Sequence, residues 1–319
     1  MNKTKKLLAG LVALGTVHCA TAQAQTFVDN FGKLSGESQS IYGSAGAVIL
    51  KRSRPDSGTI VGANPGGGVP GFLDARDFKF GYEPGIDTTI GYRFWGRQAI
   101  EVRFMHFDSE VLNSMVTPGG FIGAGFTGPG GTRFDSSYTT KFDNWEANWR
   151  YQLFDQLSVL AGFRAINLKD TATFILNSNV ATGQYSYYNR LRGAQIGADW
   201  AVFPLTSPFQ INVFGKIGRF ELNTAGGISE FQGPNFIGAF GATATSHVNV
   251  GEAGISAGYR PSPNVLIRGG YQALWIRDVG LASNGASFSL LNPSLLNSVD
   301  GARGNLLFHG ANFGVTISY

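Results

Sequence analysis

The feature that most constrains this chain is the alternation of its last dozen residues, 308–319. One parity holds Ala311, Phe313, Val315, Ile317 and Tyr319, and the other holds Asn312, Gly314, Thr316 and Ser318. Because successive side chains of a strand point to opposite faces, this segment is predicted to be a β-strand with one apolar and one polar face. Such a strand is typical of the closing strand of a transmembrane barrel, which has one face in lipid and the other toward the lumen.

Nine earlier segments show the same alternation. They lie near residues 40–51, 78–94, 100–104, 141–153, 157–168, 186–200, 208–222, 246–260 and 264–277. Five connections are long and four are short, which is the pattern of bacterial outer-membrane barrels with both termini in the periplasm. We therefore predict an all-β fold: a closed antiparallel up-and-down transmembrane barrel of about ten strands, with long extracellular loops and short periplasmic turns. Twelve strands is the alternative, if a long loop hides a hairpin.

The N-terminal segment is typical of an exported protein. Three lysines precede an apolar run at residues 7–17 that is too short to cross a bilayer as a helix, and a small-x-small motif ends at Ala24. We predict a signal peptide at 1–24, a periplasmic tail or plug at 25–39, and the barrel at 40–319. A retained N-terminal helical anchor is the alternative. The predicted location is the outer membrane of a Gram-negative-type bacterium.

Composition narrows the function classes. Charged residues make up 14% of the chain, against roughly 25% in a typical soluble domain. The net charge is +4, and three of the basic residues lie in the predicted signal peptide, so the mature chain is close to neutral and is not expected to bind nucleic acid. The single cysteine, Cys19, lies in the same segment, which leaves neither disulfides nor thiolate metal sites. No cofactor and no metal are predicted.

The charged residues of the strands share the polar parity, so we expect them inside the barrel. A basic side chain on the lipid face at mid-depth would cost roughly 2–4 kcal/mol. The residues predicted to line the lumen are Glu101, Arg103, Glu146, Arg150, Arg164, Lys216, Glu252 and Arg268. A water-soluble β-sandwich or lipocalin-like barrel, with the apolar face inside, is the alternative that alternation alone leaves open.

Aromatic residues gather near the predicted strand ends, where barrels place interfacial girdles. The predicted interface aromatics are Trp95, Tyr151, Trp200, Tyr259, Trp275 and Tyr319.

Two stretches carry a resemblance to a known group: "DFKFGYEPGIDTTIGYRFWGRQAIEVRF" and the closing "LLFHGANFGVTISY". With these motifs, the chain resembles outer-membrane barrels of the porin-like family common in planctomycetes and some proteobacteria. The resemblance implies a presumed porin or surface barrel that is inserted by the barrel-assembly machinery. It brings no functional residues with it.

The expected function is porin-like passage of small solutes or a structural role at the cell surface, without enzymatic activity. Ten strands lie near the size at which side chains fill a barrel, so a narrow or closed pore is expected. The expected partners are outer-membrane lipid, lipopolysaccharide and the barrel-assembly machinery, and small solutes are possible.

Two alternatives remain open at this point. The segments 111–126, 228–242 and 286–296 are unusually apolar for loops, so they either pack together as a lid or form a surface for a lipid or a partner protein. A barrel hydrolase would need a base and a nucleophile, and His106 with Asp108 or Glu110 and Ser109 is the nearest candidate set. The three histidines His106, His247 and His309 lack the spacing of a metal site.

Overall fold

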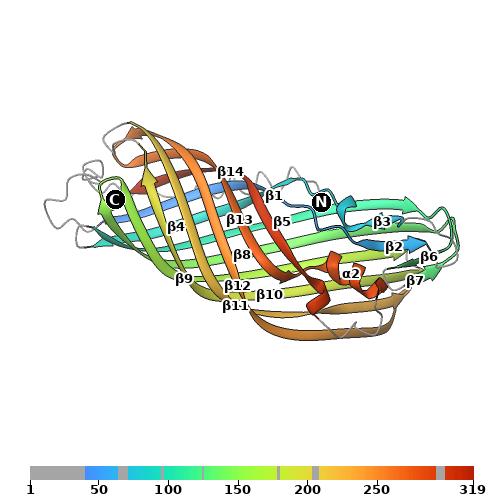
Figure 1. Ribbon diagram of the computed structural model, residues 1–319. Helices are drawn as coiled ribbons and strands as arrows, with labels where there is room; N and C mark the ends of the chain where they lie inside the picture. The colour runs from blue at the N-terminus through green and yellow to red at the C-terminus, as the bar shows by residue number, and fades with distance from the viewer. Residues whose placement is uncertain are drawn as a thin grey trace.

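The computed structural model describes residues 40–63, 71–94, 97–123, 126–177, 180–202, 208–291 and 299–319. The predicted signal peptide and the tail or plug at 25–39 lie outside this range. The described chain is dominated by one closed antiparallel barrel, because the first strand pairs with both the last strand and the second barrel strand (Figure 1). The predicted closed barrel of ten strands is confirmed.

The ten barrel strands are β1 (Ser40–Arg52), β4 (Tyr82–Phe94), β5 (Gln98–Val116), β8 (Arg133–Phe154), β9 (Leu157–Leu176), β10 (Ala181–Ala201), β11 (Phe209–Gln232), β12 (Asn235–Ser262), β13 (Val265–Gly280) and β14 (Arg303–Ser318). Short turns join them in pairs at one end, where the first strand, β1, also starts and the last strand, β14, finishes. We call this the turn end, and the opposite end the far end.

Two segments that we expected to be long loops are strands, so that prediction was wrong. Residues 169–184 and 223–245 belong mostly to β9, β10, β11 and β12, and β12 alone has 28 residues. Asn177 and Gly233, both with positive φ (42° and 56°), lie in the tight turns that replace these loops. A transmembrane strand needs only about 9–11 residues, so these hairpins continue well beyond the membrane. There the outer face need not be apolar, and the alternation that marks a membrane strand fades.

The three remaining long connections fold into the far end of the barrel. They form a four-stranded sheet of β2 (Thr59–Ala63), β3 (Leu73–Asp74), β6 (Phe121–Gly123) and β7 (Phe126–Gly128), with the short helices η2 (Ala75–Asp77), α2 (Ala282–Leu291) and η4 (Asp300–Ala302). Figure 1 shows these elements gathered at the end opposite the C-terminus. None of the helices in the described part of the chain has the length and apolar character needed to span a membrane.

These connections pack against the inward-facing side chains of the barrel. Ala282 and Ala286 of α2 are fully buried in one apolar cluster with Phe121 of β6, Phe174 of β9 and Ile228 of β11. Phe121 of the apolar segment 111–126 and Ile228 of 228–242 thus pack in the lid that we considered, whereas Leu112 and Phe236 of the same two segments are exposed. Part of the third apolar segment, residues 292–296, lies outside the described residues.

The two faces of the wall differ sharply in polarity. Ile90, Trp145 and Ile196 face outward and are 68%, 51% and 63% exposed, whereas Glu146 and Arg164 face inward and are 2% and 1% exposed. The apolar belt covers the part of each strand next to the turn end. This is the polarity of a barrel in lipid, and the reverse of a water-soluble barrel.

Candidate functional site

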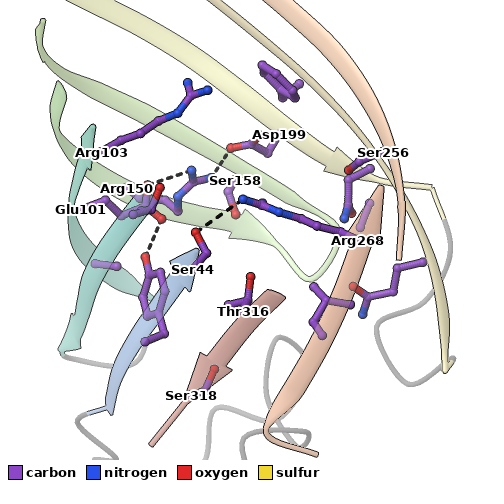
Figure 2. A pocket seen from close by; sticks show the side chains of 18 of the residues that line it. Ser44, Glu101, Arg103, Arg150, Ser158, Asp199, Ser256, Arg268, Thr316 and Ser318 are labelled. Carbon is purple, nitrogen blue, oxygen red and sulfur yellow. Dashed lines mark hydrogen bonds and ion pairs between the residues drawn. The ribbon is translucent and has the colours of Figure 1, made fainter. Parts of the chain in front are cut away.

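The lumen holds a cavity of about 300 Å³ at the turn end, which we call the vestibule. All ten barrel strands contribute to its wall, β9 through Ser158 next to its turn. Figure 2 shows Glu101, Arg150, Asp199 and Arg268 converging on it from four different strands. Glu101 and Arg150 come from the neighbouring strands β5 and β8, whereas β10 and β13 face the same cavity because the sheet is closed into a barrel.

Most of the acidic side chains in the vestibule are already paired. Arg150 binds Glu101 with 2.9 Å between Nη2 and Oε2, and its Nη1 contacts the carboxylate of Asp199. Tyr42 donates its hydroxyl to the other oxygen of Glu101 at 2.5 Å. Arg268 differs, because its one hydrogen bond among the described residues is a 3.5 Å contact from Nη2 to the Ser44 hydroxyl (Figure 2).

Beneath the vestibule, six ionic side chains form a layer across the lumen: Asp87, Arg103, Glu146, Arg164, Lys216 and Glu252. Arg103 holds three carboxylates, with distances of 2.8 Å to Asp87, 3.1 Å to Glu146 and 2.7 Å to Glu252. Arg164 reaches Glu252 at 2.8 Å, and Lys216 reaches Glu146 at 2.9 Å. Three acids balance three bases, so this ionic layer is neutral, as a buried network must nearly be.

Neutral polar side chains complete the coordination of Glu146. Asn144 and Asn148 each donate to it at 3.1 Å, and Gln195 donates at 2.9 Å. A buried carboxylate is stable only when its lone pairs are satisfied. The ionic layer is therefore a partition across the lumen, in which ion pairs and hydrogen bonds link side chains of different strands.

An apolar layer follows the ionic layer toward the far end. Nine of the ten barrel strands contribute to one buried cluster, including Phe107, Phe142, Leu191, Val250 and Phe308. The three phenylalanine rings contact one another, with centroid separations of 5.1, 4.7 and 5.3 Å. Side chains packed at this density leave little room for water between them.

A second polar cluster lies beyond the apolar layer and fixes helix α2. The Asp170 carboxylate accepts hydrogen bonds from the hydroxyls of Tyr138 at 2.6 Å and Thr140 at 2.7 Å, and from the Ala282 backbone N–H at 2.9 Å. Arg52 lies 3.4 Å from the same carboxylate and is fully buried. A carboxylate at a helix N-terminus satisfies free N–H groups and matches the helix dipole.

The structure places the eight predicted lumen residues in two groups. Arg103, Glu146, Arg164, Lys216 and Glu252 belong to the ionic layer, and Glu101, Arg150 and Arg268 belong to the vestibule. Our prediction did not include Tyr42 or Gln210 of the vestibule, nor Arg52 and Asp170 of the far cluster. The alternation could have predicted that Asp170 and Arg52 face inward. Asp170 has the same parity in β9 as Arg164, and Arg52 has the same parity in β1 as the buried Val48.

Five of the six predicted interface aromatics can be placed. Trp200, Tyr259, Trp275 and Tyr319 are exposed on the outer surface, and Tyr151 is partly exposed. Trp95 lies outside the described residues.

The histidines do not converge. His106 faces outward and contacts Asp143 at 2.6 Å, whereas Ser109 is buried on the opposite face of the same strand. His309 lies on β14, three strands around the barrel from the strand of His106, and contacts the Tyr271 hydroxyl of the neighbouring strand β13 at 2.5 Å. Across the part of the chain that the structure describes, no group of three or more His, Cys, Asp or Glu side chains is arranged to hold a metal.

Comparison with known proteins gives the fold and no family. No protein-family model and no curated protein matches the sequence. The chain is similar in structure to the outer membrane protease OmpT from Escherichia coli, with a TM-score of 0.52 and 11% identity over 91% of this chain and 100% of that chain.

Two further matches are weaker. The P. putida toluene transporter TodX has a TM-score of 0.34 and 8% identity, with coverage of 92% for both chains. The Ail protein of Yersinia pestis has a TM-score of 0.27 and 8% identity, with coverage of 88% of this chain and 99% of that chain. The likeness to OmpT, at 11% identity, is one of fold, and it shows that this chain is a barrel resembling a bacterial outer-membrane protein.

Proposed function

We propose that this protein is a closed outer-membrane barrel of a Gram-negative-type bacterium that acts as a structural element of the cell surface, and not as a diffusion pore. The observation that carries the proposal is the pair of partitions in the lumen. A solute entering the vestibule would meet the ionic layer and then the apolar layer with Phe107, Phe142 and Phe308. Passage would require both to open.

Energetics supports a permanently closed lumen. Opening the ionic layer would separate Glu146 and Glu252 from their basic partners in a buried site, and breaking such a pair costs about 3–5 kcal/mol. Wetting the apolar layer would expose side chains that are almost fully buried, at a cost of about 1.5–3 kcal/mol for each one.

The proposed orientation puts the turn end in the periplasm and the far end outside the cell. Short turns are periplasmic in bacterial outer-membrane barrels, and both termini of the described barrel lie at the turn end. The extended hairpins of β8 to β12 then project outward. We infer from the same fold that the barrel-assembly machinery inserts the chain and that lipopolysaccharide surrounds its outer half.

Single-cysteine labelling tests this orientation, since the one cysteine of the sequence, Cys19, lies in the predicted signal peptide. Asn235→Cys places a thiol in the exposed far-end turn, and Asp155→Cys places one in an exposed turn at the turn end. On intact cells, a membrane-impermeant maleimide should label the first variant and not the second until the outer membrane is permeabilised. The reverse pattern would overturn the orientation.

Solute flux tests the closed lumen. Liposomes containing the protein should swell in an isotonic solution of a small neutral sugar no faster than protein-free liposomes. Swelling that rises in proportion to the amount of inserted protein would contradict the proposal and favour the porin-like alternative.

A second candidate is a surface-binding role, and exposed apolar side chains at the far end favour it. Leu112 and Phe236 lie at the far end beyond the membrane belt and are 70% and 60% exposed. Exposed apolar patches often mark sites for lipid or a partner protein. If this role is correct, Leu112→Ser with Phe236→Ser should reduce co-sedimentation of the purified protein with lipopolysaccharide aggregates, and unchanged co-sedimentation would dismiss lipid as the partner.

A further inference from the structure

The vestibule contains hydrogen-bond donors that have no acceptor. Gln210 of β11 is 4% exposed, and its side-chain nitrogen has no hydrogen-bond partner. The Nε atom of Arg150 is likewise buried without a partner. The guanidinium of Arg268 can donate five hydrogen bonds and makes one, to the Ser44 hydroxyl. Buried donors are almost always satisfied by protein groups or ordered water, so Gln210 and Arg150 each keep one donor for water or a ligand, and the partly buried Arg268 keeps several.

The acidic side chains near Arg268 form ion pairs with other arginines. Asp87 binds Arg103 through two hydrogen bonds of 2.8 Å, and Arg150 engages both Glu101 and Asp199. Asp155, the remaining acid of the vestibule wall, lies exposed in the turn between β8 and β9. The wall carries seven basic side chains against four acidic ones, so its charge is positive. When Arg164, Glu146 and Glu252 beneath the floor are included, eight basic side chains face six acidic ones, so the charge stays positive.

The strand register places Gln210 and Arg268 in one row. Gln210 pairs with Gly258 of β12, and Gly258 pairs with Arg268 of β13. The row continues through Gly314 of β14 to Gly46 of β1, which again lack side chains. A Cβ atom built on Gly314 would lie 3.6 Å from Nε of Arg268, so the arginine lies along a bare stretch of wall. The space over Gly258 is taken by the Leu266 side chain, 2.9 Å from a Cβ built there, so the bare stretch of wall lies beside Arg268.

From this geometry we propose that the vestibule is a binding site for a small oxyanion, a carboxylate or phosphate compound that enters from the turn end. Arg268 provides the charge-assisted hydrogen bonds, which are the strong ones for planar oxyanions, and Gln210 provides a neutral donor. The volume of about 300 Å³ is at the lower limit of small-molecule sites and fits a compact metabolite-sized anion. The ionic layer forms the floor of the site, so the ligand is held and does not pass through.

The site does not depend on the surface role proposed above, because a pore with this vestibule would also concentrate anions. Its test is a single cysteine inside the vestibule. Ser256→Cys places a thiol on the vestibule wall, one inward position along β12 from Gly258, and Asn235→Cys at the exposed far-end turn is the reference position. In detergent solution, each thiol is treated with an anionic and with a cationic methanethiosulfonate reagent.

We expect the ratio of anionic to cationic reaction rates to be about tenfold higher at position 256 than at position 235, since a positive cleft raises the local concentration of anions. Adding Arg268→Gln or Gln210→Leu should lower the ratio at position 256, with Arg268→Gln having the larger effect. Arg277→Gln, a change at an exposed arginine on the same strand, should leave it unchanged. Equal ratios at the two positions, or no effect of Arg268→Gln in a correctly folded barrel, would overturn the proposal.

Inorganic phosphate and succinate then serve as direct probes. Each should slow modification of the cysteine at position 256 in a saturable manner, and Arg268→Gln should weaken this protection at least tenfold. Protection by one probe alone would identify the phosphate or the carboxylate class as the ligand. Slowing that rises linearly with salt and is equal for chloride would show screening without a site, and would overturn the proposal.

Discussion

At the scale of single residues, the ionic layer depends most on Glu146. Its carboxylate contacts Arg103, Lys216, Asn144, Asn148 and Gln195 within 3.1 Å. Replacing both partners of a buried ion pair can be nearly neutral, whereas removing one partner leaves an uncompensated charge. The layer should therefore tolerate paired changes far better than single ones.

Glu146→Gln should destabilise the folded barrel by about 3–5 kcal/mol, because three buried bases would then face two acids. Adding Lys216→Met should restore part of the loss. Denaturant unfolding in lipid bilayers, followed by tryptophan fluorescence, measures both. Arg133→Gln is the control, since its pair with Asp135 is exposed and is worth at most about 1 kcal/mol. A loss from Glu146→Gln as small as that of the control would contradict the assigned role.

Tyr187 gives a pH prediction for the part of the barrel beyond the membrane. Burial raises the pKa of its phenol from 10.0 to about 12, because the charged phenolate is disfavoured away from water. The stability that this group contributes should be complete below pH 10 and lost as the pH rises toward 12. Titration of tyrosinate absorbance should show a component with a midpoint near 12 that Tyr187→Phe removes; persistence of that component would assign it to another tyrosine.

At the scale of elements, helix α2 packs on the barrel wall through Gly285, which lies against Tyr187, and through the hydrogen bond from its first residue to the Asp170 carboxylate. A Cβ atom built on Gly285 would lie 2.4 Å from the Tyr187 hydroxyl, and one on Gly226 of β11 would lie 2.1 Å from the Tyr187 ring. The tyrosine therefore fits between a helix and a strand only because both are bare at these points. Asp170, which accepts a hydrogen bond from the first residue of α2, fixes the start of the helix.

Gly285→Val should push α2 away from the wall and destabilise the far end by about 1–3 kcal/mol, the usual cost of overpacking. Limited proteolysis should then cut within residues 281–302 faster than in the wild type. Adding Tyr187→Leu should recover part of the protection, since the two changes affect one contact. Gly238→Val, at a position where a Cβ would meet nothing within 4 Å, is the control. Equal sensitivity of the two valine variants would exclude the contact as the cause.

The elements also show how far sequence reasoning reaches. Alternation near the turn end predicted the ten strands and the direction of residues such as Trp145 and Glu146, because lipid demands an apolar outer face. It failed at residues 169–184 and 223–245, where the inward parity itself becomes apolar: Asp170 of β9 is followed toward the far end by Ala172 and then Phe174. The contrast between an apolar outer face and a polar inner face, which marks a membrane strand, is lost there, and nothing local shows that Phe142 will meet Phe308.

At the scale of the whole molecule, the lumen changes character in steps from the turn end to the far end. The vestibule comes first, then the neutral ionic layer, the apolar layer, the cluster around Asp170, and the apolar packing of α2 and β6. Each step requires side chains from strands on opposite sides of the barrel. Closure of the sheet is thus what creates the layers, and the layers in turn fix the register of the sheet.

The most direct test of the closed lumen is a planar-bilayer recording of the purified wild-type protein, with folding verified by its heat-modifiable migration on gels. We predict a silent membrane in repeated trials at both voltage polarities. Reproducible single-channel openings, with an ion selectivity that shifts when Arg150 is replaced by Glu, would show that ions pass through the vestibule and the ionic layer, and would contradict the account.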